Sequence, residues 1–393
     1  METSPAQRVV PASKGQLRSI ATALNGTHNS LGFIRLALAL LVIVDHAFVL
    51  GGFGFNPIHE LTGGQASLGS IAVAGFFAIS GYLIAKSGQS GDVLQFLWRR
   101  TLRIFPAFWT VLAVTAFVVG PAVWMIGGNK LGSYFALDGD GPFEYLARNW
   151  TLFIGAHGIN GLFLNTPYGL VSGMSEMNGS LWTLSLEWAC YMMIAALIVL
   201  SLLRQVKIVV PLVAGLFLLA QLGLFPLPSN VPVLSVPAFA GLALAFLIGA
   251  SIAVYSHRVP FHDGLGVLAA LVFAGTLRFG GFAWLGTVAG VYFVLYLGAR
   301  LPRWLQWIGS RNDYSYGTYI YGFLVQQVLA NFGLHEWGYA AYVALTVAIT
   351  LPLAWLSWHL IEKRAMALKS RGPGRGMQHW AHRIRGRWRT LRG

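Results

Sequence analysis

The amino-acid sequence predicts an all-α, polytopic membrane protein with about ten transmembrane helices. Of its 393 residues, 56% are hydrophobic and only 10% are charged, whereas about 25% of the residues in a soluble globular domain are charged. Apolar stretches close to 20 residues long recur along the chain. A helix of about that length crosses the hydrocarbon core of a bilayer.

The apolar stretches also define the expected segments. A polar segment, residues 1–30, precedes the membrane domain, residues 31–365, and a basic tail, residues 366–393, follows it. No signal peptide is evident, so the first span is expected to remain in the membrane as an anchor. The ten spans are expected at about residues 33–50, 67–86, 104–126, 181–203, 208–226, 233–254, 264–279, 281–299, 314–334 and 339–361.

The positions of Lys and Arg predict the orientation of these spans. When loops are assigned to alternate sides, 23 of these residues share the side of both termini and three lie on the other side. Positive charge concentrates in cytoplasmic loops, so we expect both termini in the cytoplasm. Most of the net charge of +14 then lies on the cytoplasmic side, where it attracts membrane lipid. We therefore expect no nucleic-acid partner.

Residues 127–180 form the largest segment expected outside the cytoplasm. They are rich in Gly, Asn and aromatic residues and too many for a simple connection. We therefore expect short helices that lie in the membrane interface and cover a site. The lone cysteine, Cys190, cannot form an intramolecular disulfide and is interpreted as a packed apolar residue.

Two ionisable residues in the first span carry the strongest functional signal, because such residues are costly within a membrane. Residues eleven positions apart on a helix differ in direction by about 20°, so Arg35 and His46 face the same side, roughly 16 Å apart along the axis. Arg35 either snorkels to the membrane surface or binds phosphate. His46 is either a buried, hydrogen-bonded histidine or a general acid or base. Asp45 points about 100° away and is expected to pair with another helix or with an arginine.

Further arginines precede the third span. Arg100 and Arg103 are three positions apart, so they share a helix face, and they are expected on the same side of the membrane as Arg35. They represent either ordinary cytoplasmic charge or part of a phosphate site. Pro106 is expected in the first turn of the span, where its missing N–H costs no hydrogen bond.

A polar sequence leads into the fourth span from the opposite side. It runs Asn178-Gly-Ser-Leu-Trp-Thr-Leu-Ser-Leu-Glu187, and Tyr191 follows one turn later. A carboxylate two turns into a span is costly, so we expect Glu187 to orient His46 or to bind an acceptor hydroxyl. Trp182 suits either a membrane-interface belt or stacking on a sugar.

The ninth span begins with tyrosines that suit an interface belt, and it continues with two amides. Gln326 and Gln327 suggest that the inner lining of the span is polar. At the end of the last span, His359 and Glu362 suggest an ion cluster at the helix end. We find no metal-ligand spacing, Walker loop or dinucleotide motif, so no metal is expected.

Six motifs in order resemble the acyltransferase 3 family of membrane acyltransferases. An Arg and a His with ten residues between them in the first span are matched by Arg35 and His46. The resemblance covers roughly residues 30–365, but many members have a histidine in the ninth span where this chain has Gly322. The other motifs are Phe76-Phe-Ala-Ile-Ser-Gly-Tyr-Leu-Ile84, Arg100-Thr-Leu-Arg-Ile-Phe-Pro106, Asn178 to Glu187, Ser315-Tyr-Gly-Thr-Tyr-Ile-Tyr321 and Ile361-Glu-Lys363.

This resemblance implies transfer of an acyl group, usually acetyl, from cytoplasmic acyl-CoA to a hydroxyl of an extracytoplasmic glycan or lipid-linked sugar. Acetyl-CoA is thus the expected donor, bound by Arg35, Arg100 and Arg103. His46 and Glu187 are the expected catalytic residues, with His46 deprotonating the acceptor or, as a variant, carrying the acyl group. The residues expected to bind the acceptor are Asn178, Ser180, Trp182, Tyr191, Tyr316 and Tyr319.

Two other functions remain open at this point. Polar residues within spans also suit a transporter or flippase of a glycan or lipid precursor that transfers no acyl group. We find no internal repeat in the sequence, which weakens this alternative. The basic tail alone would suit a membrane sensor or scaffold. The acceptor, the length of the acyl group and the oligomeric state are not fixed by the sequence.

Overall fold

The computed structural model describes residues 18–26, 29–54, 56–89, 92–136, 139–310 and 312–371. Most of the expected polar N-terminal segment and residues 372–393 of the expected basic tail lie outside these ranges. The regular secondary structure of the described residues is helical, apart from two isolated β-bridges. The predicted all-α fold is therefore confirmed for the described residues.

Each of the ten expected spans corresponds to a helix in the described part of the chain. Six helical stretches, among them α2, α4, α10 and the continuous helix Val93–Ile126, are long and apolar enough to cross a membrane. Helices α12 and α13 are apolar but shorter. The protein is thus a polytopic membrane protein. The ten main helices are α2 (Leu31–Leu50), α4 (Leu68–Gly88), α5 (Val93–Val114), α10 (Trp182–Val199), α12 (Val209–Gln221), α13 (Phe239–Val254), α14 (Asp263–Phe279), α15 (Thr287–Arg300), α17 (Ser315–Asn331) and α18 (Tyr339–Ser357).

Shorter helices connect and extend these ten. Three π-helical segments continue a neighbouring α-helix: η1 (Thr115–Val119), η2 (Phe282–Gly286) and η5 (Trp358–Glu362). The remaining α-helices are α1 (Ile20–Ala23), α3 (Pro57–Leu61), α6 (Gly120–Ile126), α7 (Leu131–Tyr134), α8 (Pro142–Asn149), α9 (Pro167–Ser172), α11 (Leu202–Gln205), α16 (Trp307–Ser310) and α19 (Lys363–Ala367). The 3-10 helices are η3 (Arg303–Leu305), η4 (Leu334–Trp337) and η6 (Leu368–Ser370).

Helix α5 begins earlier than the sequence predicts. Asp92 caps it by accepting a hydrogen bond from the backbone N–H of Gln95 at 3.0 Å. Arg100 and Arg103 therefore lie well inside this helix. The prediction that Pro106 occupies a first turn is wrong, because Pro106 lies in the middle of α5. Prolines are tolerated within membrane helices where neighbouring groups satisfy the freed backbone atoms.

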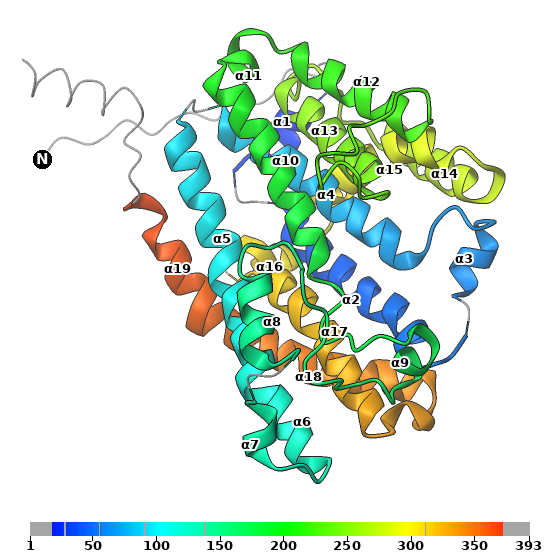
Figure 1. The fold of residues 1–393 in the computed structure, drawn as a ribbon. Coiled ribbons are helices and arrows are strands. Elements are labelled where there is room, and N and C mark those ends of the chain that lie inside the picture. Colours follow the sequence, from blue (N-terminus) through cyan, green and yellow to red (C-terminus); the bar gives the residue numbers. More distant parts are fainter. Residues whose placement is uncertain are drawn as a thin grey trace, which may run out of the picture.

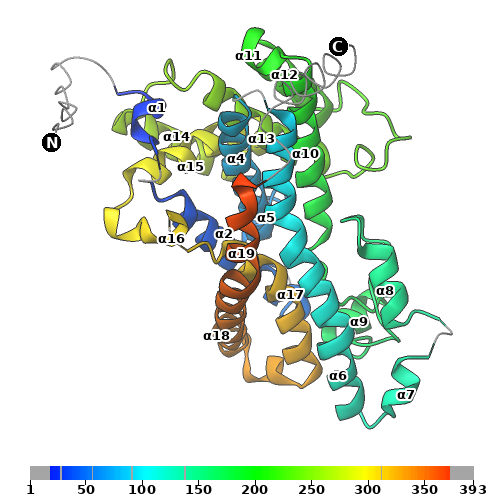
Figure 2. The same cartoon turned by 90° about the vertical axis from the view of Figure 1, so that its left-hand side faces the viewer.

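The centre of the bundle is built on a close crossing of α4 and α13. A Cβ on Gly81 would collide with the carbonyl group of Phe246, and a Cβ on Gly249 would collide with that of Ala78. Small residues allow membrane helices to approach at backbone distance. Figures 1 and 2 show α14 and α15 on one side of this crossing and α10 and α5 on the other.

Residues 127–180 fold into α7, α8, α9 and long connections, as predicted for a segment with short helices (Figure 1). Side chains of α17 anchor this segment: Gln327 donates to the carbonyl of Glu176 at 2.7 Å and accepts from Thr166 at 3.2 Å. Gln326 donates instead to the carbonyl of Ile43 in α2 at 2.9 Å. Both glutamines are fully buried, so they join helices and do not form the polar lining that the sequence suggested.

Candidate functional site

A cavity of about 310 Å³ holds the three arginines that the sequence singled out, Arg35, Arg100 and Arg103. We call it the basic cavity. Helices α2, α4, α5 and α10 and the segment before α17 supply most of its wall. The other lining residues are Ile79, Ser80, Leu83, Ile84, Ile104, Glu187, Tyr191, Gly309, Asp313, Tyr316, Trp358, Met366 and Lys369.

Two of these arginines are already paired with carboxylates. Asp313 Oδ2 lies 3.1 Å from Arg35 Nη1 and 2.6 Å from Arg103 Nη2. Arg103 Nη1 lies 3.2 Å from a second carboxylate, that of Glu362. Burial by itself would raise the pKa of Asp313, but Arg103 and then Arg35 outweigh that effect and lower the pKa to about 2. Asp313 is therefore ionised and offsets part of the positive charge of the two guanidinium groups beside it.

The position of Asp313 follows from the local chain path. Gly309 has φ +98°, a left-handed conformation that favours glycine, and its backbone lies directly against Gly32 of α2. This contact brings the following residues beside Arg35. The hydroxyl of Ser315 then donates to Asp313 Oδ1 at 2.6 Å, which leaves Oδ2 for the two arginines.

Arg100 differs from the other two arginines. No carboxylate oxygen of the described residues lies within 4.0 Å of its guanidinium nitrogens, and its buried Nε has no hydrogen-bond partner in the described chain. Glu187 lines the same cavity, but its Oε1 accepts from Ser80 and from Tyr191, each at 2.5 Å. Arg100 is thus the arginine of the basic cavity that is free to bind an anion.

A constriction of about 30 Å³, which we call the neck, adjoins the basic cavity. The rings of Phe76 and Tyr319 meet there edge to face with centroids 5.7 Å apart, and the guanidinium of Arg35 lies 5.8 Å from the centre of the Phe76 ring. The neck shares Arg35, Glu187 and Tyr316 with the basic cavity. At its other end it shares Val73, Thr183 and Tyr319 with a second cavity.

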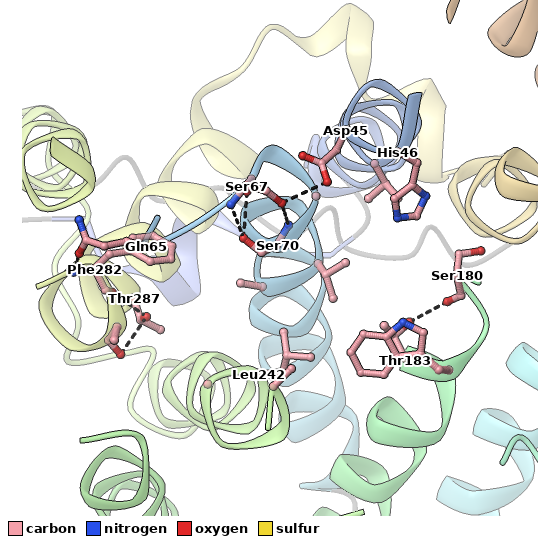
Figure 3. A pocket seen from close by; sticks show the side chains of 18 of the residues that line it. Asp45, His46, Gln65, Ser67, Ser70, Ser180, Thr183, Leu242, Phe282 and Thr287 are labelled. Carbon is pink, nitrogen blue, oxygen red and sulfur yellow. Dashed lines mark hydrogen bonds between the residues drawn. The ribbon is translucent and has the colours of Figure 1, made fainter. Parts of the chain in front are cut away.

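This second cavity contains His46 and has a volume of about 450 Å³. We call it the His46 cavity. Figure 3 shows His46, Ser180 and Thr183 on one side of it, with Phe282 and Thr287 across from them. Further polar groups come from Gln65, Ser67, Ser70, Gln221 and Trp182, and the remaining wall is formed by Val42, Asp45, Gly69, Val73, Ala74, Gly179, Ala238, Gly241, Leu242, Ala283 and Tyr319.

The imidazole of His46 has no hydrogen-bond partner among the residues that the structure describes. Its ring packs edge to face with that of Phe323, with ring centroids 5.4 Å apart. The adjacent carboxylate points elsewhere: Asp45 accepts from the side chains of Asn56 and Ser67. Ser67 is the N-cap of α4, and a carboxylate is favourable beside a helix N-terminus. Asp45 thus contacts another helix, as the sequence predicted, and both imidazole nitrogens remain available to a ligand.

The residues expected to bind an acceptor separate into two groups. Ser180, Trp182 and Tyr319 line the His46 cavity. Tyr191 and Tyr316 line the basic cavity instead. Asn178 lines none of the described cavities; its amide donates to the carbonyl of Ile320 at 2.7 Å and so fastens the start of α10 to α17.

Glu187, expected to orient His46, lies in the basic cavity and the neck and makes no hydrogen bond to His46 within the described chain. No role was expected for Asp313 from the sequence, although this residue is the shared partner of two arginines. One signal was present, since Asp313 is an ionisable residue at the edge of an apolar segment, where such residues are costly. The described residues contain no cluster of His, Cys, Asp and Glu that could hold a metal ion.

Comparison with known proteins bears on the chemistry of this arrangement. Residues 28–359 match a family model described as an acyltransferase domain. The chain is 30% identical over 360 residues to an O-acetyl transferase of Shigella phage Sf6, with 87% of this chain and 97% of the phage protein covered. It is also 30% identical over 385 residues to nodulation protein 10 of Rhizobium leguminosarum bv. viciae, with 88% and 95% covered. No solved structure matches the chain.

Proposed function

The chain belongs to the acyltransferase 3 family of membrane O-acyltransferases, and from this membership we propose that it transfers an acetyl group from acetyl-CoA to a hydroxyl of a glycan or lipid-linked sugar. One observation supports the proposal above the others. The neck shares lining residues with an arginine-lined cavity at one end and with the His46 cavity at the other. A donor with phosphates at one end and a thioester at the other has the matching shape.

In this proposal the basic cavity binds the phosphates of CoA. Arg100 makes the direct contact, because Arg35 and Arg103 are engaged by Asp313. Guanidinium groups bind phosphate through paired hydrogen bonds. Arg35 and Arg103 add positive potential around the site. Glu187 accepts hydrogen bonds from Ser80 and Tyr191. These bonds hold in place the part of the cavity wall that faces the phosphates.

The chemical step is assigned to the His46 cavity. A nitrogen of His46 takes the proton of the acceptor hydroxyl as the hydroxyl oxygen attacks the thioester carbonyl. The carbon–sulfur bond breaks, an ester forms, and the proton returns to the leaving thiolate to give CoA. A two-step variant passes through an acyl-imidazole on His46. Ser180 and Trp182, on the wall of the same cavity, are proposed to contact the acceptor.

The proposed topology has ten spans, both termini in the cytoplasm and the basic cavity on the cytoplasmic side of a bacterial inner membrane. Residues 127–180 then lie outside the cytoplasm. The polar N-terminal segment and the basic tail flank the catalytic domain of residues 31–365. Because the protein is an acyltransferase, the transporter alternative without acyl transfer is no longer preferred.

His46→Ala tests this proposal directly. Purified protein is incubated with acetyl-CoA labelled in the acetyl group and with membranes from a strain that lacks the protein. General-base catalysis contributes about 10²- to 10⁴-fold, so the variant should incorporate at least about 100-fold less label. His257→Ala, an exposed histidine between α13 and α14, is the control and should retain wild-type transfer. Wild-type rates in a folded His46→Ala protein would exclude the mechanism.

A further inference from the structure

An apolar cavity of about 210 Å³ adjoins the His46 cavity and has no part in the proposed chemical step. We call it the apolar cavity. It lies between α2 and α4 on one side and α14, η2 and α15 on the other, where Leu38, Ala78, Phe273, Val294 and Leu297 contribute to its wall. Thr287 supplies the one polar side chain of this wall, and its hydroxyl donates to the carbonyl of Phe282 at 3.1 Å.

The apolar cavity opens toward the reacting centre from the side opposite the neck. It shares Ala74, Phe282 and Thr287 with the His46 cavity, whereas the neck shares Val73, Thr183 and Tyr319. In Figure 3, Phe282 and Thr287 lie across the His46 cavity from His46 and Thr183. A group that fills the apolar cavity therefore does not obstruct a donor that arrives through the neck.

The helices around this cavity border the bilayer. The outward side of α14 carries exposed apolar residues such as Leu268 and Leu271, as expected for a helix surface in lipid. A pocket whose one polar side chain already donates its hydrogen bond to the backbone favours hydrocarbon over sugar. An acetyl group has only one methyl carbon beyond its carbonyl, so the donor has no chain to place there.

We propose that the apolar cavity binds the hydrocarbon chain of a lipid-linked acceptor, in the stretch next to its polar head, while the head lies in the His46 cavity. This inference rests on the proposed function and narrows its acceptor to an amphipathic molecule that comes from the membrane. Free polysaccharide in water would leave the apolar cavity unused.

Photolabelling tests the inference without any need for turnover. The purified full-length protein in lipid vesicles is exposed to two probes. One is a ten-carbon alkyl glucoside with a diazirine in its chain, and the other is a ten-carbon acyl-CoA with a diazirine at the same chain position. After irradiation, labelled peptides are mapped by mass spectrometry. The glucoside probe is expected to label residues of η2 and α15 that line the apolar cavity, and the acyl-CoA probe is not.

Two valines of α15 provide matched variants. Val294→Trp fills the apolar cavity, whereas Val288→Trp places the same side chain at a position that is 47% exposed and outside the cavity wall. Cavity labelling by the glucoside probe should fall at least about fivefold in the first variant and stay unchanged in the second. Size-exclusion profiles and melting temperatures identify any variant that fails to fold, and Val294→Phe then replaces Val294→Trp.

Several outcomes would overturn the inference. Labelling of the cavity by the acyl-CoA probe alone would assign it to the donor's acyl chain. Three further outcomes would show that no acceptor chain is bound there. They are equal labelling by both probes, labelling by neither probe, and an equal loss of labelling in both valine variants. His46→Ala protein should be labelled like the wild type. In the wild-type protein, cavity labelling without any acetyl transfer would contradict only the proposed function, and acetyl transfer without cavity labelling would contradict only this inference.

Discussion

The basic cavity and the His46 cavity differ in how their charged or titratable side chains are bonded. In the basic cavity a carboxylate lies between two guanidinium groups, with Asp313 within 3.1 Å of both Arg35 and Arg103. In the His46 cavity the nearest carboxylate in sequence, Asp45, bonds to Asn56 and Ser67, and the imidazole is left without a hydrogen bond among the described residues. In the basic cavity two of the three arginines are thus paired with a carboxylate, whereas the imidazole of the His46 cavity is left unbonded within the described chain.

The two cavities therefore differ in whether their charged or titratable side chains are bonded to a partner within the described chain. Buried arginines without partners would destabilise the bundle, because an unpaired charge is costly in a low-dielectric interior. Asp313 and Glu362 reduce that cost for Arg35 and Arg103, and Arg100 is left for an anion. A base has the opposite requirement, since it must reach the substrate's proton without competition from a fixed partner.

The largest loss of stability is expected when the ion pairs of the basic cavity are broken. Asp313→Asn leaves Arg35 and Arg103 without their shared counter-charge, and removing one partner of a buried ion pair destabilises a protein by about 3 to 5 kcal/mol. The side chains of this cluster are only 13 to 19% exposed. Thermal unfolding in detergent, followed by intrinsic fluorescence, measures the loss.

Glu144→Gln is the matched control for this variant. It breaks the pair between Glu144 and Arg148, whose side chains are 34% and 56% exposed, and exposed pairs contribute about 0.5 kcal/mol or less. If the two variants lower the melting temperature equally, the cluster around Asp313 is not a structural element and the contrast between the cavities fails.

The second prediction separates Arg100 from the paired arginines. Arg100→Gln should raise KM for acetyl-CoA by about 10- to 100-fold, because a hydrogen bond to a charged group contributes about 1.5 to 3 kcal/mol. Its kcat and melting temperature should change little, since Arg100 has no ion pair to lose in the described structure. Arg99→Gln, at a neighbouring position outside the basic cavity wall, serves as the control. An unchanged KM in Arg100→Gln would remove Arg100 from the donor site.

The arrangement of helices could be predicted from the sequence more fully than the site. Apolar runs in the sequence locate the ten main helices, and six helical stretches of the described chain are long enough for the hydrocarbon core of a bilayer. Helical periodicity also aligned Arg35 with His46 along what the structure places as adjoining cavities. These are local properties of the chain.

The partners of the charged residues could not be predicted in the same way. Arg103 meets an acid 210 positions away and Arg35 one 278 positions away, and only tertiary packing decides such pairs. Glu187 was expected beside His46, but the path of α10 places it with Ser80 in the basic cavity. Pro106 was misplaced for a similar reason, because a proline within a membrane helix has the same sequence signature as one at its start.

A smaller effect on acetyl transfer is expected from a change at Asp45, the carboxylate next to His46 in the sequence. Asp45→Asn should lower acetyl transfer less than tenfold and destabilise the protein by about 1 kcal/mol, because it weakens hydrogen bonds to Asn56 and Ser67 and removes no partner of His46. Steady-state rates and melting temperatures check both values. A loss as large as that of His46→Ala would mean that Asp45 acts on the base, which contradicts the division between the two cavities.

The smallest expected effect is a change in thermal stability with pH. It concerns a histidine that does pair with a carboxylate. His157, in the segment 127–180, lies 2.8 Å from Glu176, and this hydrogen bond raises the pKa of His157 above its ordinary value against a smaller opposing effect of burial. The folded state therefore holds the proton more tightly than the unfolded state does. The resulting stabilisation is complete below the unfolded pKa of about 6.5 and is lost as the pH rises through the folded value.

The melting temperature of wild type minus that of His157→Gln should thus be larger at pH 6 than at pH 9, by a small amount because His157 is 46% exposed and exposed pairs are screened. The same comparison for His46→Gln should show no such carboxylate-dependent gain at low pH, since no acid is bonded to that imidazole in the described chain. A pH-dependent difference of the same sign and size at both histidines would mean that Asp45 and Glu176 act alike. The free imidazole of the His46 cavity would then be an incorrect reading of the site.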